Sequence, residues 1–533
     1  MRPFGLALRS QRRRASRWLA PLLACLLLAL AIGCLPPITT PPAAPSPTAA
    51  APTAAPAAAT AAATAAVPAT PDTPRREIVV IHTNDEHGYL TPKEEGGFYL
   101  GGASLASASW RARGLRPTDE GGNVLLLSGG DNLTGPAIST WFQGESAIEA
   151  MNAMGYRASV IGNHEFDFGR EALARRIAQA HFPYLAANLT GGGGSEAPPI
   201  EGVLPYVILP VGDVRVGVVG LALEDTPLVT AAKNLTGLHF GPYEPALRRW
   251  VPEARAAGAE VIIVLSHAPW EDLASVAKDV ADLDVALFLG GHSHQSRASR
   301  VGAAFVATMA PHWRQYLTVR LTYDRARGAV VAMDDAAIDV LAMVDAEGGL
   351  APDPIVARVV DRWQRRADLV LGEAIGYTAR GLDARSERMH ALLLSSWLWA
   401  YPEADLAMSN TGGFRQGIDA GAITVGDVVG VLPFENVLYE IEVTGEEVRR
   451  AFRDAPEALI VGGEAWGRDG STLDPSARYR LLVTDYLYDN QKYPLRRFDA
   501  TPYDTSISWR QPVIDWIRAQ RSTEDAPLEE RLR

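Results

Sequence analysis

Five apolar runs in the first part of the chain end in side chains that bind metals. The runs cover residues 78–81, 124–127, 158–161, 261–265 and 285–289. The polar residues that follow them are Asp85 and His87, Asp131, Asn163 and His164, His267, and His292 and His294, in that order. Carboxylate, amide and imidazole groups bind divalent transition metals when no thiolate is present. The five segments together therefore predict a metal site.

The five runs have the length and residue types of buried strands, and helical patterns alternate with them. We expect helices at residues 146–154, 170–180 and 244–257, and further strands at 206–209, 215–221, 304–308 and 317–323. Alternation of this kind is typical of a layered α/β domain. Ligands bind beyond the carboxyl ends of strands in such a sheet. The polar residues are therefore expected to converge on one place.

The N-terminal region is predicted to direct export. A basic segment at residues 9–17 precedes an apolar run at 18–32, and small residues lead to Cys34. This is the pattern of a signal peptide over residues 1–34, and it resembles a bacterial lipoprotein signal with a lipid on Cys34. Residues 35–75 are mainly Ala, Pro and Thr, which predicts an extended tether that holds the folded protein off a membrane. Simple cleavage and an uncleaved anchor remain alternatives to lipidation.

Charge and cysteine content narrow the classes of function. The formal net charge is −12, and loss of the six leader arginines, which no leader acid offsets, takes it to −18. So acidic a protein is not expected to bind polymeric nucleic acid, which requires a basic surface. Both cysteines, Cys25 and Cys34, lie in the leader, so the folded part offers no thiolate ligand. Any metal must be held by nitrogen and oxygen.

The length of 533 residues favours two folded domains after the tether. We expect a metal-binding domain over residues 76–345, a linker helix within 346–370 and a second domain over 371–533. The helix is indicated by the helical spacing of Ile355, Val359 and Trp363.

The metal motifs resemble those of calcineurin-like metallophosphoesterases, in particular the secreted 5'-nucleotidase family. The matching segments are residues 82–88, 101–102, 130–131, 162–167, 266–267 and 291–294, in the family's order. The resemblance implies a four-layer αββα domain followed by a smaller α/β substrate-binding domain. It also implies two divalent ions, which the donor types restrict to zinc, manganese, iron or cobalt. Asp85, His87 and His294 would hold one ion, Asn163, His267 and His292 the other, and Asp131 would bridge them.

The same resemblance gives catalytic roles to His164 and Asp167. His164 would stabilise the transition state or donate a proton to the leaving oxygen, and Asp167 would orient its ring. Three residues apart at the start of a helix, the two side chains can face each other. His82 is interpreted differently, as a residue that flanks a turn.

Residues of the second domain resemble the substrate-binding loops of 5'-nucleotidases. The candidate residues are Arg385, Asn410, Gly413, Arg415, Phe434 and Tyr486. The arginines suit phosphate oxygens, and the aromatic rings suit a nucleobase. The family's second aromatic residue and ribose-binding Gly-Gly-Asp-Gly loop correspond to residues 484–494, where the glycines are absent and the acid is missing or displaced to Asp489.

These features predict an exported, membrane-tethered enzyme that removes phosphate from nucleotides by attack of a metal-activated hydroxide. Alternatives within the same chemistry are a 2',3'-cyclic-nucleotide phosphodiesterase, a nucleotide-sugar hydrolase and a sulfur-ester hydrolase. A surface binding protein on a retained metal scaffold is the alternative that is not an enzyme. The sequence does not indicate the oligomeric state.

Overall fold

The computed structural model describes residues 74–95, 98–192, 199–333, 338–342, 350–467 and 470–532. The predicted signal peptide, Cys34 and nearly all of the predicted tether lie outside these residues. Among the helices of the described part, none combines the length and the apolar character needed to cross a membrane.

The first of two large sheets contains three of the five predicted strands. In spatial order it consists of β17 (Ala329–Ala332), β16 (Gln315–Asp324), β1 (Arg75–Thr83), β4 (Val124–Ser128), β5 (Ala158–Val160), β6 (Tyr184–Leu185) and β8 (Val203–Leu204), with β18 (Ile338–Ala342) also paired to β16. Strands β1, β4 and β5 run parallel to one another. Their carboxyl ends, and the polar residues that follow, therefore lie at the same edge of the sheet.

The second sheet contains the other two predicted strands. Its order is β14 (Arg297–Val301), β15 (Ala304–Thr308), β13 (Leu287–Leu289), β12 (Val261–Ser266), β10 (Val214–Leu221) and β9 (Tyr206–Val211). Strands β10, β12, β13 and β15 are parallel. Both β12 and β13 thus deliver their histidines beyond a common edge.

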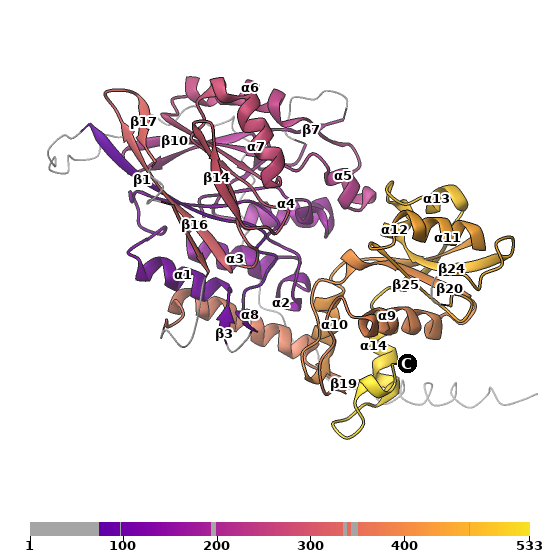
Figure 1. Cartoon of the computed structure of the whole chain (residues 1–533). Coiled ribbons are helices and arrows are strands. Elements are labelled where there is room, and N and C mark those ends of the chain that lie inside the picture. The colour runs from indigo at the N-terminus through magenta and orange to yellow at the C-terminus, as the bar shows by residue number, and fades with distance from the viewer. Residues whose placement is uncertain are drawn as a thin grey trace, which may run out of the picture. The chain divides into compact units, whose positions relative to one another are not determined.

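The two sheets pack face to face, and helices cover their outer faces (Figure 1). Alternate residues of β1 show this: Ile78 and Val80 belong to the core between the sheets, whereas Val79 and Ile81 pack against helices. The helices on the first sheet are α1 (Ala103–Ala112), α3 (Glu145–Met154) and α8 (Pro354–Leu371), and those on the second are α6 (Tyr243–Ala256) and α7 (Trp270–Asp279). The period of two along each strand thus produces the predicted four-layer αββα arrangement.

Helices at the three predicted positions begin and end within one residue of expectation, as α3, α4 (Gly169–Gln179) and α6. Helix α8 occupies most of the predicted linker, but it is more than a connection. Its residues Val356, Val360 and Trp363 are buried in the core of the first sheet's helical layer. The Trp363 indole donates to Glu149 of α3 at 2.7 Å. The amphipathic pattern indicated the helix and not the surface it packs against.

The C-terminal part forms a five-stranded sheet with helices on both faces (Figure 1). Its strands, in spatial order, are β23 (Leu459–Gly462), β20 (Leu406–Asn410), β24 (Arg478–Thr484), β22 (Val437–Thr444) and β25 (Tyr503–Ser508). One face carries α9 (Glu387–Ala400) and α14 (Gln511–Gln520), and the other carries α11 (Gly445–Asp454), α12 (Asp485–Asp489) and α13 (Leu495–Phe498). The predicted Asn410 is the last residue of β20, so it also lies at a strand end.

Short elements complete the described part. They are β2 (Lys93–Glu95), β3 (Phe98–Leu100), α2 (Ala137–Thr140), β7 (Leu189–Gly191), α5 (Thr226–Val229), β11 (Leu238–Phe240), β19 (Ala374–Thr378), β21 (Gly421–Thr424) and α10 (Val425–Val431). Single 3-10 turns lie at His164–Phe166, Ala232–Leu235, Ala281–Leu283, Thr411–Gly413 and Leu528–Glu530.

Candidate metal centre

Five of the seven candidate metal ligands have a left-handed backbone. They are Asp85 (φ 55°), His87 (47°), Asp131 (59°), His292 (70°) and His294 (56°). Residues other than glycine rarely adopt this backbone conformation, because their Cβ atom then crowds the backbone. Strain of this kind concentrates at functional sites, where the surrounding packing enforces it. Here it turns the chain sharply at the strand ends.

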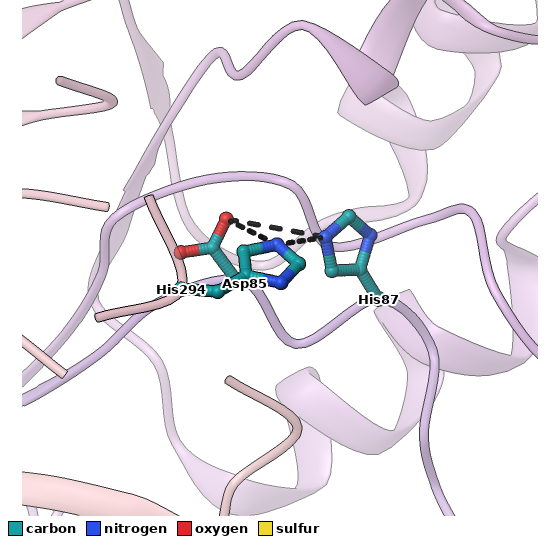
Figure 2. Close-up of side chains that lie close together, drawn as sticks. All are labelled: Asp85, His87 and His294. Atoms are coloured by element: carbon teal, nitrogen blue, oxygen red, sulfur yellow. Dashed lines mark hydrogen bonds and ion pairs between the residues drawn. The ribbon is translucent and has the colours of Figure 1, made fainter. Parts of the chain in front are cut away.

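The first group of candidate ligands is Asp85, His87 and His294 (Figure 2). The His87 Nε2 atom lies 3.0 Å from His294 Nε2, and Asp85 Oδ1 lies 3.5 Å from His294 Nε2. The His87 Nδ1–H donates to the carbonyl oxygen of Thr134 at 2.9 Å, so a neutral His87 presents a lone pair at Nε2. Lone pairs and a carboxylate oxygen at such short separations repel one another unless a cation or proton lies among them. The group therefore fits a metal ion.

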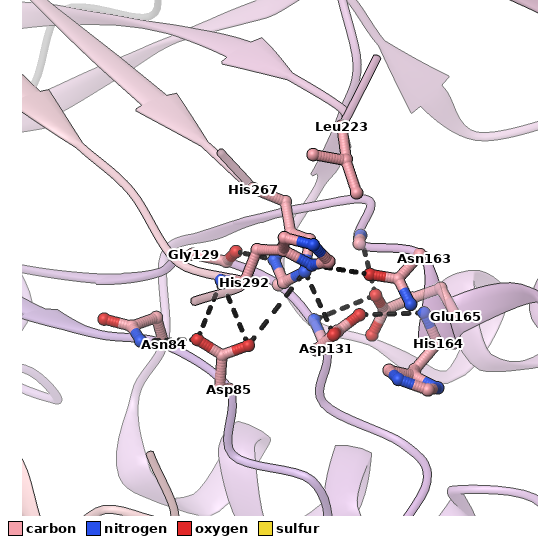
Figure 3. Close-up of polar contacts among 12 residues, drawn as sticks. Asn84, Asp85, Gly129, Asp131, Asn163, His164, Glu165, Leu223, His267 and His292 are labelled. Carbon is pink, nitrogen blue, oxygen red and sulfur yellow. Dashed lines mark hydrogen bonds and ion pairs between the residues drawn. The ribbon is translucent and has the colours of Figure 1, made fainter. Parts of the chain in front are cut away.

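The second group contains Asp131, His267 and His292, with Asn163 beside it (Figure 3). His267 Nδ1–H donates to the Gly129 carbonyl at 2.6 Å, which leaves Nε2 facing Asp131 Oδ2 at 3.0 Å. The His292 Nδ1 atom lies 3.1 Å from Asn163 Oδ1. This set of imidazole, carboxylate and amide donors contains no sulfur, and it also fits a divalent transition metal.

Asp131 lies between the two groups. Its Oδ2 atom is 3.0 Å from His267 Nε2 and 3.9 Å from His87 Nε2, so one carboxylate oxygen faces both sets of donors. A side chain at position 162 would not leave room for it, because a Cβ there would lie 2.2 Å from Asp131 Oδ1. The glycine before Asn163 is thus explained by the space that Asp131 occupies.

Burial and charge set the protonation of the centre. Burial lowers the pKa of His87 well below its ordinary value and that of His292 to about 4, which favours the neutral imidazoles that bind cations. Burial also opposes charge on His267, but the Asp131 carboxylate outweighs it and raises the His267 pKa to about 10.

Glu165 holds the backbone around Asp131, a role not inferred from the sequence. Its buried carboxylate accepts hydrogen bonds from the main-chain N–H groups of Asp131 (2.9 Å), Asn132 (2.7 Å) and Gly162 (2.7 Å). Figure 3 shows Glu165 beside Asp131. It thereby ties the ends of β4 and β5 together. The only signal in the sequence was its place within the Gly-Asn-His-Glu motif.

Asn84 and His82 are further buried supports. Asn84 Nδ2–H donates to Asp85 Oδ2 at 2.6 Å, and the same amide exchanges hydrogen bonds with the main chain of Met309. His82 was expected to flank a turn, and this was wrong: it lies within β1, fully buried, with Nε2 2.9 Å from the Gly290 carbonyl oxygen. It links the first sheet to the loop that carries His292.

We predict that Glu165→Ala weakens metal binding about 10- to 100-fold, because residues that orient metal ligands typically contribute that much. The measurement is metal affinity from a competition titration with a chelating dye. Glu171→Ala, a change at an exposed acid of α4, is the matched control and should bind metal normally. Unchanged affinity in a folded Glu165→Ala protein would contradict the prediction.

His164 and Asp167 form a close pair beside the second group. The His164 Nδ1 atom lies 2.7 Å from Asp167 Oδ2, and the main-chain N–H of His164 donates to Asp131 Oδ1 at 2.8 Å. Burial lowers the pKa of His164, but the carboxylates of Asp167 and Asp131 outweigh it, so the pKa lies above its ordinary value. The pair matches the expected geometry of an imidazole held by a carboxylate.

A cavity of about 650 Å³ opens beside this pair. It is lined by six of the residues predicted for metal binding and catalysis and by all six predicted for substrate binding. These are Asp131, Asn163, His164, Asp167, His292 and His294, and Arg385, Asn410, Gly413, Arg415, Phe434 and Tyr486. The remaining candidates, Asp85, His87 and His267, are buried.

Arg415 and Phe434, two residues of the cavity lining, contact the metal and catalytic residues. The Arg415 Nη2 atom is 3.4 Å from His87 Nε2, and its guanidinium carbon is 5.9 Å from the centre of the Phe434 ring. The Phe434 ring also stacks on His164 at 5.8 Å between centroids. Gly413 packs closely against Trp509, since a Cβ there would lie 3.2 Å from its ring.

Asp489 was one of the two alternatives for the family's ribose-binding acid. The Asp489 carboxylate pairs with Arg496 at 3.3 Å. Asp489 is not one of the described residues that line the cavity. Of the two alternatives drawn from the sequence, a missing acid or one displaced to Asp489, this position favours the missing acid. Asp485, the other acid of this segment, bonds to Lys233 at 2.6 Å and to the main chain of Val437. Lys233 itself lines the cavity, which the sequence did not indicate.

The fold and the centre define the class of the protein. Residues 78–296 match the family model described as calcineurin-like phosphoesterase. Residues 370–467 match the model described as the 5'-nucleotidase C-terminal domain. The chain belongs to the calcineurin-like phosphoesterases, and within them to the two-domain 5'-nucleotidase family. It is accordingly a metal-dependent phosphoester hydrolase.

Individual relatives agree with this assignment. Human 5'-nucleotidase is 28% identical over 441 residues, which cover 73% of this chain and 74% of the human protein. The trifunctional nucleotide phosphoesterase protein YfkN of Bacillus subtilis is 26% identical over 449 residues, which cover 75% of this chain but only 29% of YfkN. A solved structure of a 5'-nucleotidase precursor from Thermus thermophilus superposes with a TM-score of 0.71 at 23% identity, covering 84% of this chain and 97% of that one.

Proposed function

We propose that the protein is an exported hydrolase that removes phosphate from nucleotides. The observation that carries this proposal is the single cavity in which candidate metal ligands, a histidine–aspartate pair, two arginines and two aromatic rings meet. A phosphate needs the cations and arginines, and a nucleobase needs the rings. A nucleoside monophosphate contains both parts.

In this proposal the centre holds two divalent ions, each zinc, manganese, iron or cobalt. Asp85, His87 and His294 would hold one, and Asn163, His267 and His292 would hold the other, with the Asp131 carboxylate available to both. When bound, such a pair supplies positive charge next to the phosphorus and lowers the pKa of a water molecule toward neutrality.

The cavity residues bind and orient the substrate. His164, held by Asp167, gives a proton from its ring to the leaving oxygen of the nucleoside. Arg385, Arg415 and Asn410 bind the phosphate or sugar oxygens, and Gly413 lets the backbone run close to them. Phe434 and Tyr486 receive the base between their faces.

The direct test is phosphate release from a panel of nucleoside monophosphates, with and without a chelator. We expect chelation to stop release, and added manganese or zinc to restore it. Release that a chelator does not affect, or none from phosphomonoesters, diesters and pyrophosphates alike, would contradict the proposal.

Phe434→Ala is predicted to raise KM for AMP roughly tenfold, since stacking of a base on an aromatic ring contributes about 1–3 kcal/mol. Ribose 5-phosphate, which has no base, serves as the internal control and should show little change. Initial rates over a range of each substrate measure both effects. An equal loss on both substrates would mean that Phe434 acts on folding or on the metal centre.

We also propose that the mature protein is tethered to the outer side of a membrane through a lipid on Cys34. The basic, apolar and small-residue segments of the leader support this, as does the Ala-, Pro- and Thr-rich stretch after it. Fractionation of cells that express the wild type or Cys34→Ser tests the idea. The wild type should sediment with membranes and the variant should not; equal release of both would contradict the anchor.

A further inference from the structure

Residues 226–235 form a short segment, the bridging segment, in the wall of the cavity described above. It consists of α5 and of the 3-10 turn at Ala232–Leu235. Both of its ends are buried, at Thr226 and Leu235. The function proposed above leaves this segment without a role, although several of its residues line the cavity, namely Val229, Ala231, Lys233 and Asn234.

Asn234 of the bridging segment bonds to the turn that carries the His164–Asp167 pair. Its Nδ2–H groups donate to the carbonyl oxygen of Phe166 at 2.8 Å and to that of Asp167 at 3.4 Å. Helix α4 begins directly after this turn, at Gly169, which has a left-handed backbone (φ 79°). Regular helical geometry therefore does not run from the turn into α4, and the Asn234 side chain fixes the end of the turn instead.

Thr230 holds the beginning of the same turn. Its buried hydroxyl donates to the carbonyl oxygen of Asn163 at 3.2 Å, across 67 positions of the chain. The main chain is thus held both before and after His164 by one distant segment. Because a side chain takes its position from the main chain that carries it, these bonds restrict where the His164 ring and the Asp167 carboxylate lie.

The other side of the bridging segment contacts the C-terminal part of the chain. The Lys233 Nζ atom donates to the buried Asp485 carboxylate at 2.6 Å, and the Asn490 amide donates to a main-chain oxygen of α5 at 3.0 Å. The second oxygen of Asp485 accepts from the main-chain N–H of Val437 at 3.2 Å, directly after the loop that carries Phe434. One acid thus connects the bridging segment to a loop of the substrate cavity.

We propose that Asn234 is a positioning residue for the hydrolysis: it holds the His164–Asp167 pair in line with the leaving oxygen, and the Lys233–Asp485 ion pair fixes the bridging segment to the C-terminal part. This inference rests on the proposed function. A proton donor must lie within about 3 Å of the oxygen it serves, and a displacement of about 1 Å can cost about a hundredfold in rate. Asn234 acts through the pair and not on the substrate.

Asn234→Ala is expected to lower kcat for AMP about 10- to 100-fold, because the proton donor is displaced. Its KM should stay within about twofold, since the contacts to bound substrate remain. For p-nitrophenyl phosphate, whose leaving oxygen departs without a proton, kcat should fall less than about threefold. Rates are measured with manganese, and metal content and circular dichroism of the same samples should match the wild type.

Two further variants separate hydrogen bonding from packing. Asn234→Leu fills the same space without N–H donors and should lose as much turnover of AMP as Asn234→Ala. Asn123→Ala is the matched control and should behave as the wild type. The Asn123 amide lies at the amino end of β4, away from the strand ends that carry the site, and bonds to Glu77.

A double-mutant cycle tests the connection to the C-terminal part. Asp485→Asn weakens the ion pair with Lys233, and Asp485 is not one of the described residues that line the cavity. This variant should lower kcat for AMP roughly two- to fivefold, the range for one ion pair. In combination with Asn234→Ala it should cause no further loss, because both changes act on the same contact.

Each other outcome overturns a distinct claim. If Asn234→Ala slows both substrates equally or slows neither, or if it loses metal, Asn234 does not position the proton donor, although the proposed function stands. If Asn234→Leu restores turnover, the Asn234 hydrogen bonds are not the cause. If the losses in the cycle multiply, the ion pair does not act through Asn234. If the wild type releases phosphate from neither substrate, the proposed function fails, and this inference fails with it.

Discussion

Replacement of Asp131 by alanine is expected to lower phosphate release from AMP by at least about a thousandfold. A shared ligand supports both cations, and the two cations contribute several kcal/mol to catalysis. The structure gives the reason. One oxygen of this carboxylate faces His267 at 3.0 Å and His87 at 3.9 Å, so its loss removes a donor from both groups at once. The variant should also bind less metal.

Asp361→Ala, a change at an exposed acid of α8, is the matched control and should keep full activity and metal content. Metal content by mass spectrometry and kcat/KM are measured on the same samples. Circular dichroism of each sample verifies that the variant is folded. A folded Asp131→Ala protein with wild-type metal content and turnover would contradict the assignment of Asp131 to the centre.

His164→Asn is expected to keep the metal and lose turnover by roughly 10²- to 10⁴-fold, which is the range for a general acid. The His164 ring contacts the Asp167 carboxylate, and the main-chain N–H of His164 donates to the Asp131 carboxylate. His164 nevertheless belongs to neither group of candidate ligands. The loss should fall mainly on kcat. It should be smaller for a substrate such as p-nitrophenyl phosphate, whose leaving oxygen departs without a proton.

Two further variants complete this test. Asp167→Asn should cause a smaller loss of kcat, since Asp167 acts by holding the His164 ring. His181→Asn, at an exposed histidine, should have no effect. Loss of metal from His164→Asn would instead make His164 a ligand, and an equal loss on both substrates would argue against proton donation.

The sequence was informative where one local pattern determined the geometry. Parallel strands that end in acid or histidine were sufficient to place His267 beside His292, because the carboxyl ends of β12 and β13 share an edge of the second sheet. Their position near Asp131, which follows β4 of the first sheet, depends in addition on the packing of the two sheets. The layered α/β class followed from the alternation of strand and helix patterns, and the four-layer αββα arrangement was implied by the family resemblance. In the structure, neighbouring apolar residues such as Ile78 and Val79 pack on opposite faces of β1. These features depend on strand direction and on the period of two.

What the sequence did not indicate depends on contacts between distant segments. Asn84 orients Asp85 only because its amide also bonds to Met309, 225 residues later, and no local pattern encodes that contact. In the sequence, Glu165 resembles any acid at the start of a helix. Its role depends on the three main-chain N–H groups that donate to its carboxylate in the structure. The choice between a missing acid and one displaced to Asp489 has the same cause, because the partner of Asp489, Arg496, lies on the next helix.

The central claim is that acids and histidines from five strand ends hold two cations and that catalysis depends on them. Quantitative metal analysis of the purified enzyme, paired with AMP hydrolysis on the same samples, tests it most directly. We predict close to two equivalents of zinc, manganese, iron or cobalt per chain after reconstitution, with activity that disappears on chelation and returns with metal. Protein that binds no transition metal, or that hydrolyses AMP equally well after complete chelation, would contradict the account.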